Sequence, residues 1–346
     1  MLTQPSYRSL RNPTVAIVGA TGAVGAELIR CLEERDFPAA GLRLLASARS
    51  AGRAMTFRGA PVEVQALGED SFAGVDLALF AADADTARTY APLARAAGAV
   101  VIDNSSAFRM DPDCPLVVPE VNLESLTWSR GVVANPNCTA IILCVAVAPL
   151  QRRFGLRRLQ VATYQAASGA GAPAMQELLD STRAFLDGRP FEPQVFRHPY
   201  AFNVFSHNDA VDPLTGYNGE ESKVMAETRR ILGAANLPVG VTCVRVPVLR
   251  AHALAVTAEF DAPVPPSAVR ECLEEAAGVR VIDDREANHF PMPVEAQGQG
   301  DVLAGRIRRD LGDPSGRSVA MFLAGDQLLK GAALNAVQIA EQMLVA

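Results

Sequence analysis

The feature that most limits the fold is a glycine-rich segment at residues 19–25, with the sequence GATGAVG. It follows the apolar run Val15–Val18 and precedes Glu27–Arg35, in which apolar residues recur at helical spacing. Glycines at a strand-to-helix turn let backbone N–H groups approach a pyrophosphate at the helix N-terminus, although such a turn can also serve packing alone. The candidate cofactor-binding residues of this turn are Gly19, Thr21, Gly22, Ala23, Val24 and Gly25.

The first half of the chain alternates short apolar runs with helical patterns. The runs at 42–46, 77–81, 100–102 and 131–134 lack strict alternation, which is typical of parallel strands covered on both faces. Ala84–Ala97 lies between two of them and is rich in alanine, which favours a helix. Strands alternating with helices predict a doubly wound α/β sheet that begins with the glycine turn.

The second half of the chain has a different pattern. Its longer segments at 156–167, 241–249, 252–260 and 302–309 often alternate apolar with polar residues, which favours an antiparallel or mixed sheet with one open face. Helices are expected at 174–186, 222–232 and 267–277, and an amphipathic helix at 328–344. We therefore expect an α+β layer after the first domain, and 346 residues suit about two domains. Residues 188–220 show no clear period and predict a long ordered excursion near a site or a subunit contact.

The segment after the second expected strand indicates which dinucleotide would bind. An Asp or Glu there would hold the ribose hydroxyls of NAD, but residues 46–53 read ASARSAGR and contain no acid. Arginine suits a 2′-phosphate because its fork matches phosphate oxygens. NADP is therefore favoured over NAD, with a solvated basic loop as the alternative reading. The candidate contacts are Ser47, Arg49 and Ser50, with Arg53 as a further arginine.

Cys138 is the strongest nucleophile candidate among the six cysteines. It lies in the polar junction Asn135–Thr139, between an expected strand and the apolar helix expected at 140–148. At a helix N-terminus, the macrodipole and the unpaired N–H groups lower a thiol pKa and favour the nucleophilic thiolate. A thiolate needs a proton partner, and the chain has four histidines, at 198, 207, 252 and 289. Their spacing alone does not select one of them.

Composition excludes several other classes of function. The formal net charge is −6, which disfavours nonspecific binding to nucleic acid. No apolar run is long enough to suggest a membrane span. The cysteines form no C-x-x-C pair and lie near no histidine cluster, so no metal site is expected. Scattered cysteines in a chain of this size suggest reduced thiols and a cytoplasmic location.

Eight segments together resemble the aspartate-semialdehyde dehydrogenase family, in its bacterial form, along almost the whole chain. Besides the glycine turn, they are SARSAGR at 47–53, DNSSAFR at 103–109, NPNCT at 135–139, QAASGAG at 165–171, EESKVMAET at 220–228, RVPVLRAH at 245–252 and GDQLLKGAALNAVQIAE at 325–341. The departures are small, since Thr139 and Ala253 stand where serine is common in the family.

The resemblance implies a role for particular residues. Cys138 is similar to the acylated nucleophile, His252 to the acid–base partner, and Gln165 to the glutamine that orients the acyl group. Arg245 matches the arginine that binds the substrate α-carboxylate, and Glu220 the carboxylate that meets the substrate ammonium. The matches to the phosphate-binding residues are Arg109, Asn137 and Lys223. The matches to cofactor contacts near the nicotinamide are Ser168, Gly169 and Gln327, with Asn335 as the alternative to Gln327.

The resemblance also implies a domain arrangement and a reaction. Residues 1–137 with 327–346 would form a Rossmann-like NADP-binding domain, and residues 138–326 an α+β catalytic and dimerisation domain. The enzyme would convert L-4-aspartyl phosphate reversibly to L-aspartate 4-semialdehyde through a thioester on Cys138, with NADP as cofactor. The family serves lysine, diaminopimelate, methionine and threonine biosynthesis. Its members imply a homodimer, with a tetramer as the alternative, acting on small molecules.

Two other functions are consistent with much of this pattern. The first is a related acyl-phosphate reductase, such as an N-acetyl-glutamyl-phosphate reductase. Its N-acetylated substrate carries no ammonium, so Glu220 argues against it. The second is a noncatalytic NADP-binding paralogue, which the presence of Cys138, Gln165, Arg245 and His252 disfavours.

Overall fold

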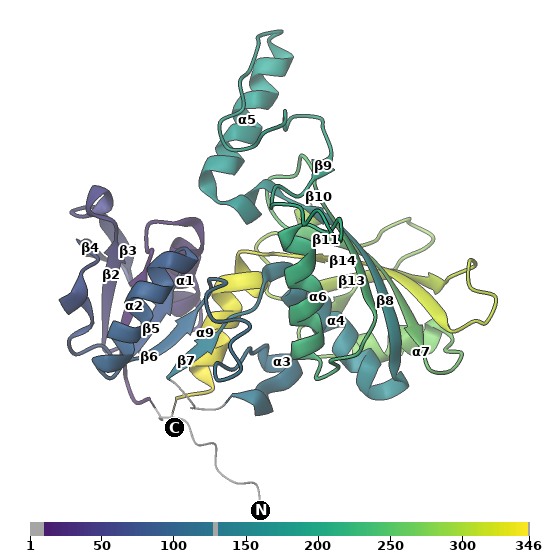
Figure 1. The fold of residues 1–346 in the computed structure, drawn as a ribbon, viewed down its shortest axis with the longest axis horizontal. Coiled ribbons are helices and arrows are strands. Elements are labelled where there is room, and N and C mark those ends of the chain that lie inside the picture. Colours follow the sequence, from purple (N-terminus) through teal and green to yellow (C-terminus); the bar gives the residue numbers. More distant parts are fainter. Residues whose placement is uncertain (1–9, 127–130, 345–346) are drawn as a thin grey trace, which may run out of the picture. The chain divides into compact units, whose positions relative to one another are not determined.

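The computed structural model describes residues 10–126 and 131–344, and the chain divides into two compact units (Figure 1). The first unit contains residues 1–137 and 332–346, and the second contains residues 138–331. The ends of the predicted cofactor-binding domain, at residues 1–9 and 345–346, and its segment 127–130 lie outside the described residues. Among the described helices, none is both long enough and apolar enough to cross a membrane.

A seven-stranded sheet in the order β3-β4-β2-β1-β5-β6-β7 forms the centre of the first unit. Its strands are β1 (Thr14–Val18), β2 (Gly41–Ala46), β3 (Ala54–Phe57), β4 (Ala60–Ala66), β5 (Leu77–Phe80), β6 (Val100–Asp103) and β7 (Val132–Ala134). All neighbours pair in parallel except the β3–β4 hairpin. Every residue of β5 and β6 is buried, as expected for strands covered on both faces. The predicted doubly wound α/β fold is confirmed.

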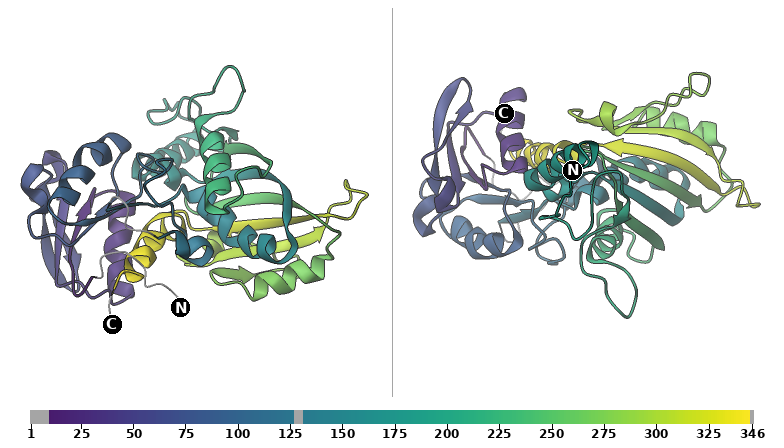
Figure 2. Two further views of the ribbon diagram at one scale, coloured as in Figure 1. Left: turned by 60° about the horizontal axis from the view of Figure 1, so that its bottom comes forward. Right: turned by 90° about the horizontal axis from the view of Figure 1, so that it is seen from above.

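Helices from both ends of the chain pack in the first unit. Helix α1 (Ala23–Glu34) follows the glycine turn, and α2 (Ala84–Ala96) connects β5 to β6. The C-terminal helix α9 (Leu334–Glu341) packs against α1 and β6, and Figure 2 shows it in yellow beside the purple α1. The guanidinium of Arg35 binds both carboxylate oxygens of Glu341, at 2.6 and 2.7 Å. The last segment of the chain is thus part of the first unit.

The second unit is built on a mixed sheet in the order β12-β13-β14-β11-β8-β10-β9. Its strands are β8 (Leu156–Gln165), β9 (Phe205–Ser206), β10 (Val239–Arg245), β11 (His252–Phe260), β12 (Val279–Val281), β13 (Val302–Arg309) and β14 (Ser318–Gly325). Strands β8 and β10 run parallel, and β11 runs antiparallel to both β8 and β14. This arrangement confirms the predicted mixed sheet.

Helices cover one face of this second sheet. Helix α4 (Cys138–Phe154) packs on β8, β11, β13 and β14, while α6 (Gly219–Ile231) packs on β10 and α7 (Pro266–Glu274) on β13. The other predicted helix is α5 (Ala172–Leu186), from which the chain continues into the excursion that ends at α6. Shorter elements include α8 (Pro293–Ala296) in the second unit, and α3 (Pro119–Asn122) with a 3-10 turn at Leu123–Ser125 in the first unit.

Three expectations need correction. The predicted strand at 241–249 ends at Arg245, because Pro247 cannot continue the ladder. The predicted helix at 328–344 begins with a π-helical turn at Leu329–Ala333 before α9. The return to the first unit starts at Ala332 and not at Gln327, because Gln327 makes its hydrogen bonds inside the second unit. The sequence pattern did not predict strands β3, β4, β9, β12 and β14.

Candidate active site

The glycine turn has the geometry that a dinucleotide needs. Gly19 has a φ of +83°, and a Cβ there would lie 2.4 Å from the carbonyl oxygen of Ala81. A Cβ on Gly25 would lie 2.3 Å from the carbonyl oxygen of Gly19. Gly22 is the N-cap of α1, and no side chain caps the helix there, so its first backbone N–H groups suit an anion. Close backbone contacts explain why glycine is needed at Gly19 and Gly25. The uncapped helix start at Gly22 instead fits a pyrophosphate.

The second candidate cofactor segment lies beside this turn. The hydroxyl of Thr21 lies 3.4 Å from that of Ser50, which joins the loop after β1 to the loop after β2. Ser50 is buried, while Ser47 and Arg49 are exposed. Arg49 therefore follows the carboxyl end of β2, which pairs in parallel with β1, the strand that leads to the α1 N-terminus. These residues fit a dinucleotide that carries an extra phosphate.

Cys138 is the first residue of α4, at the position predicted from the sequence. It is partly exposed, whereas the other five cysteines are buried. Burial raises the pKa of Cys31 and Cys243 to about 12, and it raises the pKa of Cys144 and Cys272 as well. Those four thiols are disfavoured as nucleophiles, and the helix start favours a thiolate at Cys138.

A glycine allows a close approach to the nucleophile. A Cβ on Gly331 would lie 2.8 Å from the Cβ of Cys138 and 3.2 Å from the Cβ of Gln327. Gly331 belongs to the π-helical turn before α9, and the sequence analysis did not identify it. Only a residue without a side chain fits against Cys138 at this point.

A buried hydrogen-bond network begins next to the nucleophile. The amide of Gln165 donates to the hydroxyl of Thr139 at 3.2 Å and to a carboxylate oxygen of Glu220 at 3.0 Å. Its own oxygen accepts from the hydroxyl of Thr163 at 3.1 Å. Gln165 and Glu220 are buried, and Gln165 is the Cα partner of Arg245 in the β8–β10 pairing. Strand register thus brings an amide and a guanidinium to one end of the sheet, and helix α6 (Gly219–Ile231) adds the carboxylate.

Arg245 is a buried cation held by neutral groups. Its Nη1 donates to the carbonyl of Ala166 at 3.1 Å, and its Nη2 lies 2.7 Å from Nε2 of His207. Nε and Nη2 both donate to the side-chain oxygen of Asn208, each at 3.2 Å. The guanidinium also lies 5.7 Å from the centroid of the Phe196 ring. Arg245 forms no ion pair with any described carboxylate, which leaves its charge available to an anionic ligand.

His252 is fully buried at the start of β11 with a defined tautomer. The backbone N–H of Ala166 donates to its Nδ1 at 3.0 Å, so the neutral ring carries its proton on Nε2. Nε2 is buried and has no hydrogen-bond partner among the described residues. Burial, and then the charges of Arg245 and His207, lower the pKa of His252 well below its ordinary value. A buried donor without a partner is costly, and it suits a group that binds a reacting oxygen.

Gly169 keeps space open between these two residues. A Cβ at this position would lie 2.9 Å from Arg245 Nη1 and 2.9 Å from both Cε1 and Nε2 of His252. The neighbouring Ser168 hydroxyl accepts a hydrogen bond from the side-chain amide of Gln327. The amide oxygen of Gln327 in turn accepts from the backbone N–H of Ala251 at 2.9 Å. The three residues matched to nicotinamide contacts thus lie in the second unit around His252.

Asn335, the alternative to Gln327, has another position. It is buried in α9 and donates to the side-chain oxygen of Asn135 at 2.7 Å and to the carbonyl of Val117 at 3.0 Å. It therefore holds the segment before Cys138 within the first unit. Gln327 remains the better cofactor candidate, because it contacts Ser168.

The three candidate phosphate-binding residues are divided between the units. Arg109 donates from Nε to the carbonyl of Asn135 at 3.0 Å and from Nη2 to the carbonyl of Asn104 at 2.7 Å. Arg109 and Asn137 are buried in the first unit. Lys223 is half-buried in the second unit, on helix α6. Their joint role in binding phosphate stays a prediction.

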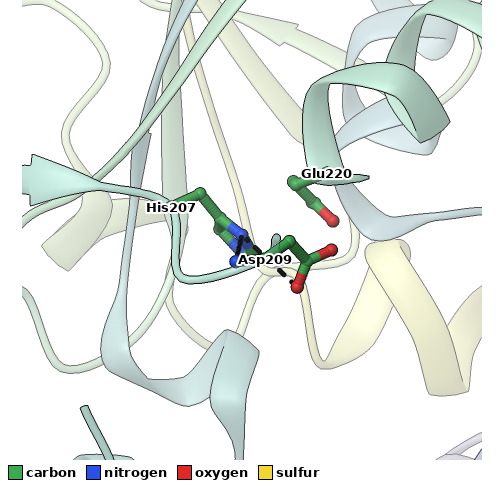
Figure 3. Close-up of side chains that lie close together, drawn as sticks. All are labelled: His207, Asp209 and Glu220. Carbon is green, nitrogen blue, oxygen red and sulfur yellow. Dashed lines mark hydrogen bonds and ion pairs between the residues drawn. The ribbon is translucent and has the colours of Figure 1, made fainter. Parts of the chain in front are cut away.

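Lys223 neutralises two acidic groups. Its Nζ lies 2.7 Å from Oδ2 of Asp209 and 3.9 Å from Oε2 of Glu220. Figure 3 shows Asp209 between His207 and Glu220, and ligating atoms of these three residues lie within 4.8 Å of one another. A metal ion could use such a set, but the ammonium of Lys223 already bridges the two carboxylates. The set therefore fits a lysine-centred charge cluster better than a metal site.

Several residues of this site were not predicted from the sequence. His207, Asn208 and Asp209 lie in the aperiodic excursion at 188–220, where no hydrophobic period places a side chain. The only signal was the excursion itself, which the sequence analysis associated with a site or a subunit contact. Residues 207–209 of this excursion contact Arg245 and Lys223.

Comparisons with known proteins agree with this geometry. A family model described as semialdehyde dehydrogenase, NAD binding domain, matches residues 14–129, and one described as semialdehyde dehydrogenase, dimerisation domain, matches residues 147–330. The aspartate-semialdehyde dehydrogenase of Synechocystis sp. is 49% identical over 332 residues, which are 95% of this chain and 97% of that protein. That of Aquifex aeolicus is 46% identical over 334 residues, with 95% and 97% covered.

A solved structure shows the same similarity in three dimensions. The crystal structure of aspartate semialdehyde dehydrogenase II from Vibrio cholerae superposes with a TM-score of 0.92 at 42% identity, covering 96% of this chain and 98% of that one. Both halves of the chain and their order are therefore shared. The chain belongs to the aspartate-semialdehyde dehydrogenase family.

Proposed function

We propose that this enzyme catalyses the reversible reductive dephosphorylation of L-4-aspartyl phosphate to L-aspartate 4-semialdehyde, with NADP as its cofactor. The observation that carries the proposal is the placement of a buried cation and a buried carboxylate, Arg245 and Glu220, on either side of Gln165. Gln165 in turn contacts Thr139, the neighbour of Cys138. The names of the relatives identify the same substrate.

The substrate end of the site matches an α-amino acid. The guanidinium of Arg245 suits the planar α-carboxylate, because a carboxylate accepts two parallel N–H donors. Glu220 suits the α-ammonium, which an N-acetylated substrate lacks. Gln165 lies between them and orients the acyl group toward Cys138. This pair of opposite charges favours an aspartate derivative over the N-acetyl-glutamyl alternative.

The chemistry begins at Cys138. Its thiolate attacks the acyl carbon of the aspartyl phosphate, a C–S bond forms, and the C–O bond to phosphate breaks, leaving a thioester and inorganic phosphate. NADPH, when bound, supplies the hydride that reduces this thioester. The tetrahedral intermediate on Cys138 then expels the thiolate, which releases the aldehyde and restores the nucleophile.

His252 holds a proton where the reaction needs one. Its Nε2–H donates to the acyl oxygen and stabilises the negative charge that develops there when the carbonyl is reduced. The proton is shared with that oxygen in the tetrahedral intermediate and returns to Nε2 when the intermediate collapses. Because Ala166 fixes the tautomer, the ring presents this proton without reorientation.

Each unit by itself offers groups that suit phosphate or part of the cofactor. In the first unit Arg109 and Asn137, and in the second unit Lys223, offer the N–H donors proposed for the leaving phosphate. The uncapped start of α1 at Gly22 takes the pyrophosphate, and Arg49 with Ser47 and Ser50 takes the 2′-phosphate. Ser168, Gly169 and Gln327 orient the nicotinamide end near His252.

A homodimer is the proposed assembly. The second unit matches a family model described as a dimerisation domain. Among the described helices, α4, α6 and α7 pack on the sheet of this unit. On β8, Tyr164 is partly exposed and its ring lies 6.0 Å from that of Phe322 on β14. Light scattering on the purified protein would give the mass, and a mass of one chain would contradict the proposal.

One assay tests the activity directly. The purified enzyme should reduce NADP in the presence of aspartate semialdehyde only when inorganic phosphate is added, because phosphate must release the acyl group from Cys138. N-acetyl-glutamate semialdehyde serves as the matched substrate control. Faster turnover of the N-acetylated aldehyde, or no turnover of either, would refute the proposed substrate.

A further inference from the structure

One edge of the Arg245 guanidinium is already occupied by a neighbouring side chain. Nε and Nη2 form the fork that best matches a carboxylate, and both donate to Oδ1 of Asn208 at 3.2 Å. Arg245 is buried, whereas Asn208 is exposed. Asn208 thus covers the fork from the solvent side. Among the described residues, the side chain of Asn208 forms hydrogen bonds with Arg245.

The remaining contacts of Arg245 are also neutral. Nη2 lies 2.7 Å from Nε2 of His207, and because a guanidinium only donates, this nitrogen accepts. Nη1 donates to the carbonyl of Ala166. Burial, followed by the charge of Arg245, lowers the pKa of His207 to about 4, so the ring stays neutral near pH 7.

The acid in this part of the chain serves another cation. Asp209 follows Asn208 directly, but its carboxylate binds Lys223 at 2.7 Å. Three consecutive residues therefore bind two different cations: His207 and Asn208 contact Arg245, and Asp209 contacts Lys223. Arg245 is positioned without losing its charge to a protein carboxylate.

We propose that the side-chain amide of Asn208 competes with the substrate's α-carboxylate for the Nε–Nη2 edge of Arg245, and thereby sets the affinity for the substrate. This inference rests on the proposed function of Arg245. A carboxylate displaces the amide because it brings a negative charge and one oxygen for each of the two donors, whereas the amide offers a single neutral oxygen to both. Asn208 can leave at low cost because its side chain is exposed to solvent.

The isosteric variant Asn208→Asp gives the sharpest test. It places a carboxylate on the same edge without a change of shape, so the intramolecular competitor becomes as strong as the substrate. We expect the KM for aspartate semialdehyde to rise at least about tenfold, in the range for charged hydrogen bonds. The KM values for phosphate and NADP should change less than about twofold, because those ligands do not use this edge.

The opposite change tests the same idea in the other direction. Asn208→Ala removes the competitor and its two hydrogen bonds to Arg245, and should lower the KM for aspartate semialdehyde about two- to tenfold, in the range for a net hydrogen-bond contribution. If Asn208 instead helped to bind the substrate, this variant would raise that KM and overturn the proposal. An unchanged KM in Asn208→Asp would overturn it as well.

Controls separate this proposal from its premise. Asn236→Asp makes the same chemical change at an exposed turn of the second unit and should leave all three KM values unchanged. If the wild-type enzyme fails to oxidise aspartate semialdehyde, the proposed function is wrong. If the wild type is active and the two Asn208 variants shift KM in the same direction, only the competition is wrong.

Discussion

The backbone N–H of Ala166 donates to Nδ1 of His252 at 3.0 Å, across 86 positions of sequence. Ala166 directly follows β8, and its carbonyl accepts from Arg245, so one peptide segment orients both side chains. The bond places the imidazole proton on Nε2, which is buried beside the space that Gly169 leaves open.

Replacing Cys138 by serine should lower turnover at least about a thousandfold, because an alcohol at a helix start remains protonated where a thiol ionises. The fold and NADP binding should be retained, as shown by circular dichroism and by NADP titration. Cys272→Ala is the control, since burial raises the pKa of that thiol. Iodoacetamide should label Cys138 first, and inactivation that accompanies labelling of another cysteine would refute the assignment.

Gly169→Ala should lower kcat about tenfold to a hundredfold. The added methyl would come within 2.9 Å of Arg245 Nη1 and His252 Nε2, and displacing reacting groups by fractions of an ångström slows the chemistry. Gly41→Ala is a matched control, because its nearest atom would be 3.9 Å from the new Cβ. Equal kcat values for the two variants would show that the space beside His252 is not used.

The stability of the folded enzyme should depend on His207 below neutral pH. Burial and the charge of Arg245 lower the pKa of His207 to about 4 in the folded state, while the unfolded chain titrates near 6.5. The unfolded state therefore binds a proton first as pH falls, and folding stability is lost between about pH 6.5 and 4. At pH 5 the loss is about 2 kcal/mol relative to pH 7.

Thermal melts of His207→Gln between pH 7 and 5 check this dependence. The variant should show a smaller decrease in Tm than the wild type as the pH falls. Part of the decrease should remain, because the lowered pKa of His252 also reduces folding stability at low pH. Exposed His198→Gln should retain the wild-type slope. Parallel Tm curves for the wild type and His207→Gln would mean that His207 does not carry the linkage.

Arg49→Ala should reduce the preference for NADP over NAD about tenfold to a hundredfold. One charged hydrogen bond to the 2′-phosphate contributes on the order of 1.5–3 kcal/mol, while NAD lacks that phosphate. The measurement is kcat/KM for both cofactors, with Arg53→Ala for comparison. A variant that retains the parental ratio would place the 2′-phosphate elsewhere.

Arg245→Lys and Arg109→Ala should show a crossed pattern of KM effects. Lysine retains the charge of Arg245 but loses the planar fork, so the KM for aspartate semialdehyde should rise while that for phosphate changes little. Arg109→Ala should raise the phosphate KM most. Steady-state kinetics with each substrate varied in turn gives both values. If the two variants raise the same KM, one of the two anion sites is wrongly assigned.

The local sequence determined much of the secondary structure of this protein and the position of its candidate nucleophile. The glycine turn at 19–25, the alternation of strands and helices, and the position of Cys138 at a helix start depend on neighbours within a few residues. Such features can be read from hydrophobic period and from residues with special backbone geometry. The strand at 252–260 was predicted with the observed bounds for the same reason.

The tertiary structure decided which distant residues meet. Among four histidines, spacing favoured none, and the β8–β11 pairing placed His252 beside Ala166. The β8–β10 register set Gln165 opposite Arg245, and the aperiodic excursion brought His207 and Asn208 to the same guanidinium. Strand register and long connections join residues that are 37 to 86 positions apart, so no local period encodes their contacts.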